Sequence, residues 1–250
     1  MSAALFEYTL RLGDDALIDG QRLSEWCGHG PFLEEDVGVA NTALDLIGRA
    51  RLLLAYAGTV EGKGRGEDDL AYTRDEREWR NVLITELPRG DFAFTTVRQF
   101  LLDAFNRQLY ERLCLSLDAT LAGIAGRAVK ESEYHLRHTG EWVLRLGDGT
   151  RESNRRAQRA LDDLWPYTAE LFESDPVQEQ MEAQGIAPAT ASLRAAWLHT
   201  VEPPLRSAQL TIPGNTWPQT GGRQGMHSEH MGFLLAEMQF VQRAYPGQAW

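Results

Sequence analysis

The sequence predicts an all-α protein built around a bundle of long helices. Two observations support this prediction: hydrophobic residues recur with a period near 3.6 along almost every long segment, and the alternation typical of strands is scarce. Four predicted helices are amphipathic and about 20 residues or longer, and long antiparallel helices that pack on one another form a bundle. Because no repeat or change in composition marks a second domain, residues 1–250 are predicted to form a single domain.

The ends of the predicted helices follow from capping and helix-breaking residues. Asp118 and Ser228 are suitable N-caps, and Thr73 with Glu76 three residues later has the spacing of a capping box. Pro166 is expected to kink one helix and the pair Pro203–Pro204 to interrupt another, since proline removes a backbone donor. The predicted helices cover residues 14–27, 33–57, 73–86, 92–117, 119–146, 153–172, 191–210 and 229–244, and residues 212–225 are predicted to form an extended loop.

Composition narrows the functional classes. The chain has 25 Lys and Arg against 36 Asp and Glu, a formal net charge of −11, which argues against nucleic acid as a partner because phosphate contacts need clustered cations. The N-terminal residues lack the pattern of a signal peptide, and the longest apolar run is far short of the ~20 residues that a membrane span needs. A cytoplasmic protein without a membrane partner is therefore expected.

The segment Glu131–His138 offers the strongest indication of chemistry. Glu131, His135 and His138 fall at positions i, i+4 and i+7, on one face of a predicted helix, and Trp142 continues that face. A carboxylate and imidazoles that face one way from a bundle helix are what a carboxylate-bridged di-iron protein uses. Such proteins take a Glu from each of two helices and a Glu-x-x-His motif from each of two others.

The other long helices supply only a degenerate version of that ligand set. An acid and an amide, Asp103 and Asn106, stand at the Glu-x-x-His spacing in one helix, and Asp162 and Trp165 stand there in another. Asparagine is a poor iron ligand and tryptophan is none, so neither motif is intact. The predicted relic cluster consists of Asp45, Asp103, Asn106, Glu131, His135, Asp162 and Trp165.

Three interpretations of this cluster stay open at the level of sequence. The favoured one is a relic site whose acids and imidazole are held by hydrogen bonds and ion pairs, because buried charges persist when they are paired. The others are a working mononuclear or dinuclear metal site and plain surface polarity. Under the favoured interpretation the chain has no catalytic residue and no metal ligand. A second pair of imidazoles, His227 and His230, is better explained by packing and hydrogen bonding beside the cap Ser228.

The chain also resembles the family of the C subunit of phenylacetyl-CoA epoxidase, a multicomponent bacterial monooxygenase that epoxidises an aromatic ring. The similarity extends from near the N-terminus to Trp250, which makes it more specific than a single motif. The segments that carry it are Tyr8–Asp15, Leu23–His29, Ala40–Gly48, Tyr72–Arg77, Glu133–Arg137, Thr220–Arg223, Met226–Gly232, Leu235–Gln239 and Pro246–Gln248.

This resemblance implies a ferritin-like four-helix bundle with additional helices. It also implies a structural, non-catalytic subunit without a cofactor of its own, which pairs with the catalytic A subunit of the same complex. The di-iron centre is expected in that partner, and electrons are expected to come from NADPH through the reductase of the complex. No catalytic residue is carried over to this chain, and Asn106, where a relative could carry His, takes it further from metal binding. The alternative is a self-sufficient di-iron oxidase or oxygenase that uses Glu131, His135, His138, Asp45 and Asp103.

Overall fold

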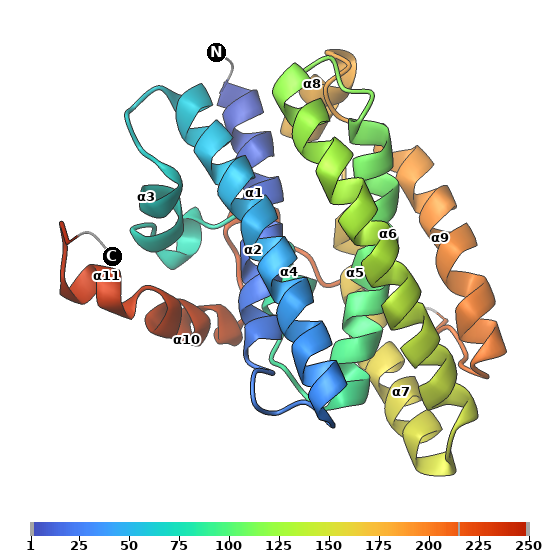
Figure 1. Ribbon diagram of the computed structural model, residues 1–250. Helices are drawn as coiled ribbons and strands as arrows, with labels where there is room; N and C mark the ends of the chain where they lie inside the picture. The colour runs from blue at the N-terminus through green and yellow to red at the C-terminus, as the bar shows by residue number, and fades with distance from the viewer. Residues whose placement is uncertain (1–2, 215, 249–250) are drawn as a thin grey trace. The chain divides into compact units, whose positions relative to one another are not determined.

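The computed structural model describes residues 3–214 and 216–248, which contain helices and connecting loops and no strand. The prediction of an all-α protein is confirmed. The chain forms two compact units (Figure 1). Unit 1 combines the N-terminal segment as far as Pro88 with the C-terminal segment from Thr220, and unit 2 is Arg89–Gln219. The single domain expected from the sequence stays a prediction.

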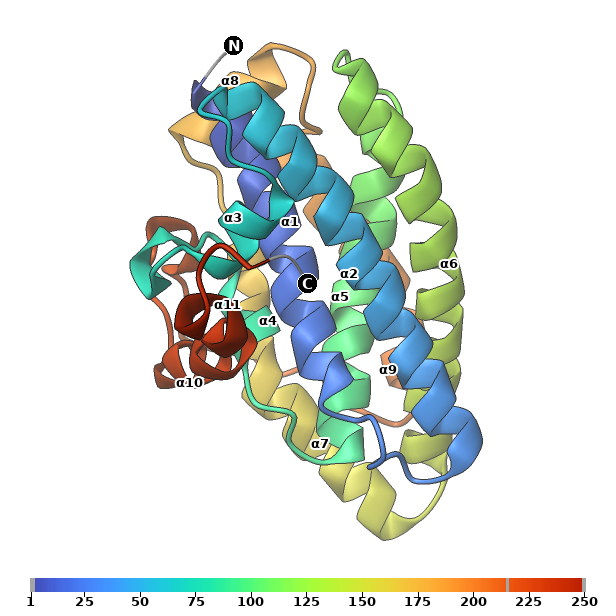
Figure 2. The ribbon, with the colours of Figure 1, turned by 60° about the vertical axis from the view of Figure 1, so that its left-hand side comes forward.

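Unit 1 is organised around an antiparallel pair of helices, α1 (Ala3–Ser24) and α2 (Leu33–Glu61) (Figure 2). Two glycines of α1 lie where the helices approach closely. A Cβ atom on Gly13 would stand 2.7 Å from Leu54 Cδ2, and one on Gly20 would stand 3.2 Å from the Ala43 carbonyl oxygen. A larger residue at Gly13 would therefore push the two helices apart or displace Leu54.

The rest of unit 1 packs against this pair. Trp79, Met231 and Leu234 belong to the same buried cluster as Leu10 and Leu17 of α1, so the C-terminal segment shares its core with the N-terminal helix. The shorter elements of unit 1 are α3 (Glu67–Tyr72), η1 (Glu76–Glu78), α4 (Leu83–Glu86), η3 (Gly222–Gln224), α10 (Glu229–Met238) and α11 (Phe240–Ala244).

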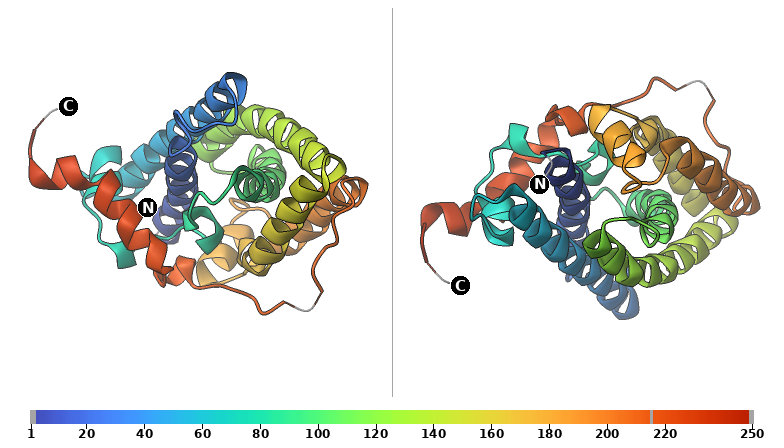
Figure 3. Two further views of the ribbon diagram at one scale, coloured as in Figure 1. Left: turned by 90° about the horizontal axis from the view of Figure 1, so that it is seen from below. Right: turned by 90° about the horizontal axis from the view of Figure 1, so that it is seen from above.

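Unit 2 is built around helix α5 (Phe92–Leu113), which forms an antiparallel pair with α6 (Ala119–Asp148). Viewed from below and from above, α5 lies among α6, α7 and α9 (Figure 3). These three neighbours contribute to the burial of most residues of α5. The other elements of unit 2 are α7 (Arg151–Leu164), η2 (Trp165–Phe172), α8 (Pro176–Ala183) and α9 (Thr190–Ser207).

Several local predictions are confirmed. Asp118 caps α6 through its Oδ1, which accepts a hydrogen bond from the Leu121 backbone N–H at 2.9 Å, and Ser228 caps α10. At Pro166 the regular α7 gives way to the 3₁₀ helix η2, because proline cannot donate to the preceding turn. The expected loop over residues 212–225 is also present in the residues that are described, apart from the short η3.

Other local predictions are wrong. The first helix begins at Ala3 rather than Asp14. The helix expected over residues 73–86 is broken into η1 and α4, and Thr73 is the C-cap of α3 rather than an N-cap. Helix α9 continues through Pro203–Pro204, where the sequence predicts an interruption. In the described part of the chain, no helix is both long and apolar enough to cross a membrane.

Candidate functional site

The face of α6 that turns into unit 2 carries small and polar residues. Ser132, His135 and Thr139 are buried on it, and His135 has only 1% of its surface exposed. These residues follow one another at spacings of three and four, the repeat of a single helix face. The buried face is therefore centred one residue away from the stripe that the sequence analysis proposed, which began at Glu131.

Helix α5 places its acid against this face. Asp103 is 1% exposed, and its Oδ2 lies 3.1 Å from the Thr139 hydroxyl oxygen. Its Oδ1 accepts a hydrogen bond from Gln99 Nε2, also at 3.1 Å. The Thr139 hydroxyl lies within 3.0 Å of the His135 carbonyl as well, so its single proton has two acceptors in reach. Asp103 and His135 thus belong to one buried polar row between α5 and α6.

Glu131 and His138 lie on either side of this row rather than in it. Glu131 is half-buried, and its Oε1 lies 2.7 Å from Nε of the exposed Arg127 one turn earlier. The ring of His138 stacks on the exposed ring of Tyr134, with 2° between their planes. Both residues therefore have partners on α6 itself, which is how surface residues of a helix are commonly held.

The remaining positions of the predicted cluster are spread over the fold. Asn106 is half-buried one turn after Asp103, whereas Asp162 is exposed on α7 and accepts a hydrogen bond from Gln158 Nε2 at 2.8 Å. Trp165 packs against Trp197, with ring centroids 5.4 Å apart, inside an aromatic cluster. Asp45 lies on α2 in unit 1 and is half-buried.

The residues present do not fit a di-iron centre of the ferritin type. Such a centre needs carboxylates from four helices and an imidazole from two of them. At the two Glu-x-x-His spacings in unit 2 an amide and an indole replace the imidazole, and the acid three residues before the indole is exposed. Among residues 3–214 and 216–248, no group of three or more His, Cys, Asp or Glu side chains is arranged to hold a metal ion. What the row between α5 and α6 can do is fix the register of two helices through hydrogen bonds.

A second polar centre, in unit 1, was not predicted from the sequence. The carboxylate of Glu86 and the imidazole of His227 are both fully buried, and Glu86 Oε2 lies 2.7 Å from His227 Nδ1. The other ring nitrogen, Nε2, faces the Trp79 carbonyl at 3.2 Å. A carbonyl only accepts, and the Glu86 carboxylate already accepts from Asn81 Nδ2 and the Ser228 N–H. With an ionised Glu86 both ring nitrogens donate, and the ring in that pair is an imidazolium.

The electrostatic environment of His227 agrees with that assignment. Burial alone lowers the pKa of this imidazole, but the hydrogen bond and the negative charge of Glu86 outweigh it, so the net pKa is raised above its ordinary value. The folded protein therefore favours the charged form of the ring more than the unfolded chain does. The contact ties His227, which precedes the N-cap of α10, to the end of α4, which lies 141 positions earlier in the chain.

Two neighbouring acids of α1 are paired in the same unit. The buried Asp14 accepts hydrogen bonds from Arg74 Nη1 and from the Arg80 backbone N–H, both at 2.9 Å. Asp15 accepts from Arg223 Nη2 at 2.7 Å and from the Val82 backbone N–H at 2.8 Å. Burial raises the pKa of the Asp15 carboxyl, although the Arg223 guanidinium opposes that shift. Consecutive acids inside an apolar helix are a weak indication of such pairs in the sequence, because a buried acid needs a partner.

The helices and the buried polar row define a class: an all-α protein with a ferritin-like helical fold. The whole chain, residues 1–250, matches the phenylacetic acid catabolic protein family, and the chain belongs to that family. It is 48% identical over 246 residues to the C subunit of the 1,2-phenylacetyl-CoA epoxidase of Escherichia coli (strain K12). The aligned region covers 98% of this chain and 99% of that relative.

Proposed function

We propose that this chain is the non-catalytic structural subunit of a ring-1,2-phenylacetyl-CoA epoxidase, a multicomponent monooxygenase of phenylacetate catabolism. The observation that carries the proposal is the similarity to the C subunit of such an epoxidase along 98% of the chain. At that identity and coverage the two chains are expected to share every element of the fold, and the similarity does not depend on one motif.

The contacts in unit 2 support a structural role. Asp103 accepts hydrogen bonds from the neutral groups of Gln99 and Thr139, as an acid does when it organises helix packing. Trp165 packs beside Trp197 within an aromatic cluster, with ring centroids 5.4 Å apart. The role of these side chains is to keep the helices in place.

In a structural role, this chain leaves the epoxidation to the catalytic subunit. In this proposal the catalytic subunit holds the di-iron centre, the reductase of the complex delivers electrons from NADPH, and the present chain binds and stabilises the catalytic subunit in the cytoplasm. This chain needs no cofactor of its own. Its contribution is a rigid helical surface, which keeps the catalytic subunit folded and correctly assembled.

Genetic replacement tests the proposal. The gene for this chain replaces that of the C subunit in Escherichia coli, and growth is measured on phenylacetate as the only carbon source. Restored growth, together with elution of this chain and the catalytic subunit in one peak on size-exclusion chromatography, is the expected result. Growth equal to that of a strain that lacks the C subunit, with the two proteins eluting separately, would refute the proposal. The same strain with its own C subunit serves as the positive control.

A further inference from the structure

The C-terminal helices α10 and α11 of unit 1 bury polar side chains and expose large apolar ones. Gln239, at the junction of the two helices, is 2% exposed, and its Nε2 donates to the carbonyls of Ala71 and Arg74 at 3.1 and 3.0 Å. One turn later, Arg243 Nη2 donates to the Arg74 carbonyl at 2.9 Å and lies 3.0 Å from Asp75 Oδ1. The inner side of this segment is thus held by hydrogen bonds to backbone carbonyls.

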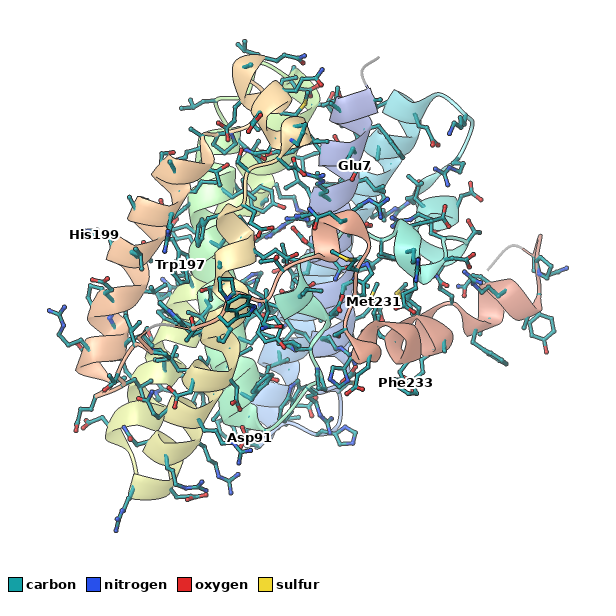
Figure 4. The ribbon with its side chains drawn as sticks, turned by 180° about the vertical axis from the view of Figure 1, so that it is seen from behind. Glu7, Asp91, Trp197, His199, Met231 and Phe233 are labelled. Carbon is teal, nitrogen blue, oxygen red and sulfur yellow. The ribbon has the colours of Figure 1, made fainter. Side chains whose placement is uncertain are left out.

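The outer side presents rings to the solvent. Phe233 on α10 is 75% exposed, and Phe240, the first residue of α11, is 64% exposed. Val241 beside them is 40% exposed. Figure 4 shows Phe233 on the side of α10 opposite Met231, which is fully buried. We name the surface formed by Phe233, Phe240 and Val241 the C-terminal face.

The C-terminal face consists mainly of two exposed aromatic side chains. Two phenylalanine side chains exposed to this extent present on the order of 250 Å² of apolar area, since each ring side chain has about 150–250 Å². Single apolar residues are ordinary on a protein surface, but aromatic residues are enriched at the centres of protein interfaces. A standard interface buries about 800 Å² on each partner, so this face has the size of its apolar centre.

A groove continues the C-terminal face. It has a volume of about 490 Å³ and lies between α10–α11 and the segment that contains η1. Leu235, Ala236 and Phe240 contribute its apolar wall, while Asp75 and Glu76 stand on the opposite side. A helix or turn of another protein that inserts one apolar side chain here would bury Phe240 from two directions, which is how anchor residues of interfaces are held.

The charges around the face decide what kind of protein fits it. Glu229 and Glu237 are exposed on α10, and Asp75 and Glu76 border the groove, against a single nearby cation, Arg243, among the groove residues. The chain as a whole has a net charge of −11. Two copies of this chain would bring like charges together, which costs free energy, whereas a partner with Lys or Arg around an apolar centre would be attracted.

We propose that the C-terminal face is the surface by which this chain docks the catalytic subunit of its complex, through an apolar segment of that subunit flanked by basic residues. This inference rests on the proposed function, because it takes the partner from it. The polar inner side of α10–α11 keeps the helices attached to unit 1, and the aromatic outer side supplies the contact. The apolar side chains on the outer side of α10–α11 are then buried only when the catalytic subunit is bound.

The test uses the full chain and the catalytic subunit of its own organism, each purified after separate production. The double variant Phe233→Glu/Phe240→Glu is compared with the wild type and with a matched control, Leu115→Glu/Leu117→Glu, whose two leucines are 83% and 80% exposed in unit 2. We expect the face variant to bind about 30-fold more weakly or worse, as for interface anchors, and the control to bind like the wild type. Circular dichroism and thermal unfolding confirm that all three proteins are folded.

The outcomes separate this inference from the proposed function. Binding of the wild type and of the face variant with equal affinity would overturn the docking surface and leave the structural role intact. A wild type that does not bind the catalytic subunit would overturn both. A wild type that forms homodimers that the face variant lacks would show that a second copy covers the face, which also refutes the proposal. Protection of residues 229–244 from hydrogen exchange by the catalytic subunit would support it.

Discussion

Different interactions hold the elements of the two units together: ion pairs in unit 1 and packed aromatic rings in unit 2. In unit 1, three acids of low exposure meet cations that lie far away in the sequence: Asp14 pairs with Arg74, Asp15 with Arg223, and Glu86 with His227. In unit 2, the helix α9 is held by rings, because Trp197 packs between Trp165 and Phe172 and donates its indole N–H to the Leu101 carbonyl at 2.9 Å.

This difference determines what each unit tolerates. A buried ion pair fixes orientation, and its cost appears when one member is removed and the other is left in a medium of low polarity. An aromatic cluster depends on filled volume, so it responds to size rather than to charge or pH. The three pairs of unit 1 are therefore expected to be sensitive to charge and to pH, and the ring cluster of unit 2 to cavities.

The largest effect is expected for Asp14→Ala. Both Asp14 and Arg74 are almost completely buried, so the substitution leaves an uncompensated guanidinium and should lower the free energy of unfolding by about 3–5 kcal/mol. Urea unfolding measures the loss. The double variant Asp14→Leu/Arg74→Met, which removes both charges, should recover most of it. A double variant as unstable as Asp14→Ala would show that lost packing, not the unpaired charge, is responsible.

Trp197→Ala tests unit 2 in the same way. The side chain is 2% exposed, and its removal should cost about 3–5 kcal/mol through the cavity that it leaves. The loss in the free energy of unfolding should be nearly the same at pH 6 and pH 9, because the ring cluster of Trp165, Phe172 and Trp197 contains no titrating group. A strong dependence on pH would mean that this region is held by charge, contrary to the comparison.

His227→Gln is expected to have a smaller effect that depends on pH. The amide can replace part of the hydrogen bonding but not the positive charge opposite Glu86, so we expect a loss of about 1–3 kcal/mol at pH 6. The folded-state pKa of His227 is raised, so its contribution is complete below the unfolded-state pKa near 6.5 and is lost as the pH rises through the folded-state value. The difference between wild type and variant should therefore shrink from pH 6 to pH 9, and a difference that grows would contradict the imidazolium assignment.

The smallest effect is expected at a helix cap. Asp118→Ala removes the acceptor for the Leu121 N–H and should cost about 1 kcal/mol. Asp162→Ala is a matched control, since this acid is exposed on α7 and accepts a hydrogen bond from Gln158, whose amide also bonds the Thr211 backbone. Thermal unfolding of the two variants should show a lower Tm for the first only. An equal decrease for both would mean that Asp162 has a structural role that its exposure does not indicate.

The long helices can be predicted from the sequence because their signals are local. Caps such as Asp118 and Ser228 act within three residues, and Pro166 changes its own turn. The start of α1 could not be predicted from the sequence, because Gly13 and Asp14 resemble a helix boundary. In the structure Gly13 allows α2 to approach, and Asp14 pairs with Arg74, 60 positions away. No local pattern contains that information.

The prediction of the relic cluster is limited for the same reason: it depends on contacts between residues that are far apart in the sequence. The helix period correctly places His135 on a buried face, but the phase of that face is set by the neighbouring helix, which selects Ser132 and Thr139 rather than Glu131 and His138. Asp162 has the right spacing to Trp165, yet α7 turns that acid to the solvent. Spacing alone predicts which residues share a face, whereas packing decides which face is buried.

The most direct test of the central claim is the iron content of this chain purified alone from cells supplied with iron. The account predicts far less than one iron atom per chain, because the Glu-x-x-His spacings hold an amide, an indole and an exposed acid, and the residues of the predicted cluster are spread over the fold. Catalytic subunit purified from the same cells is the positive control. About two iron atoms per chain, as in a ferritin-type site, with a loss of iron in a His135→Ala variant, would contradict the account.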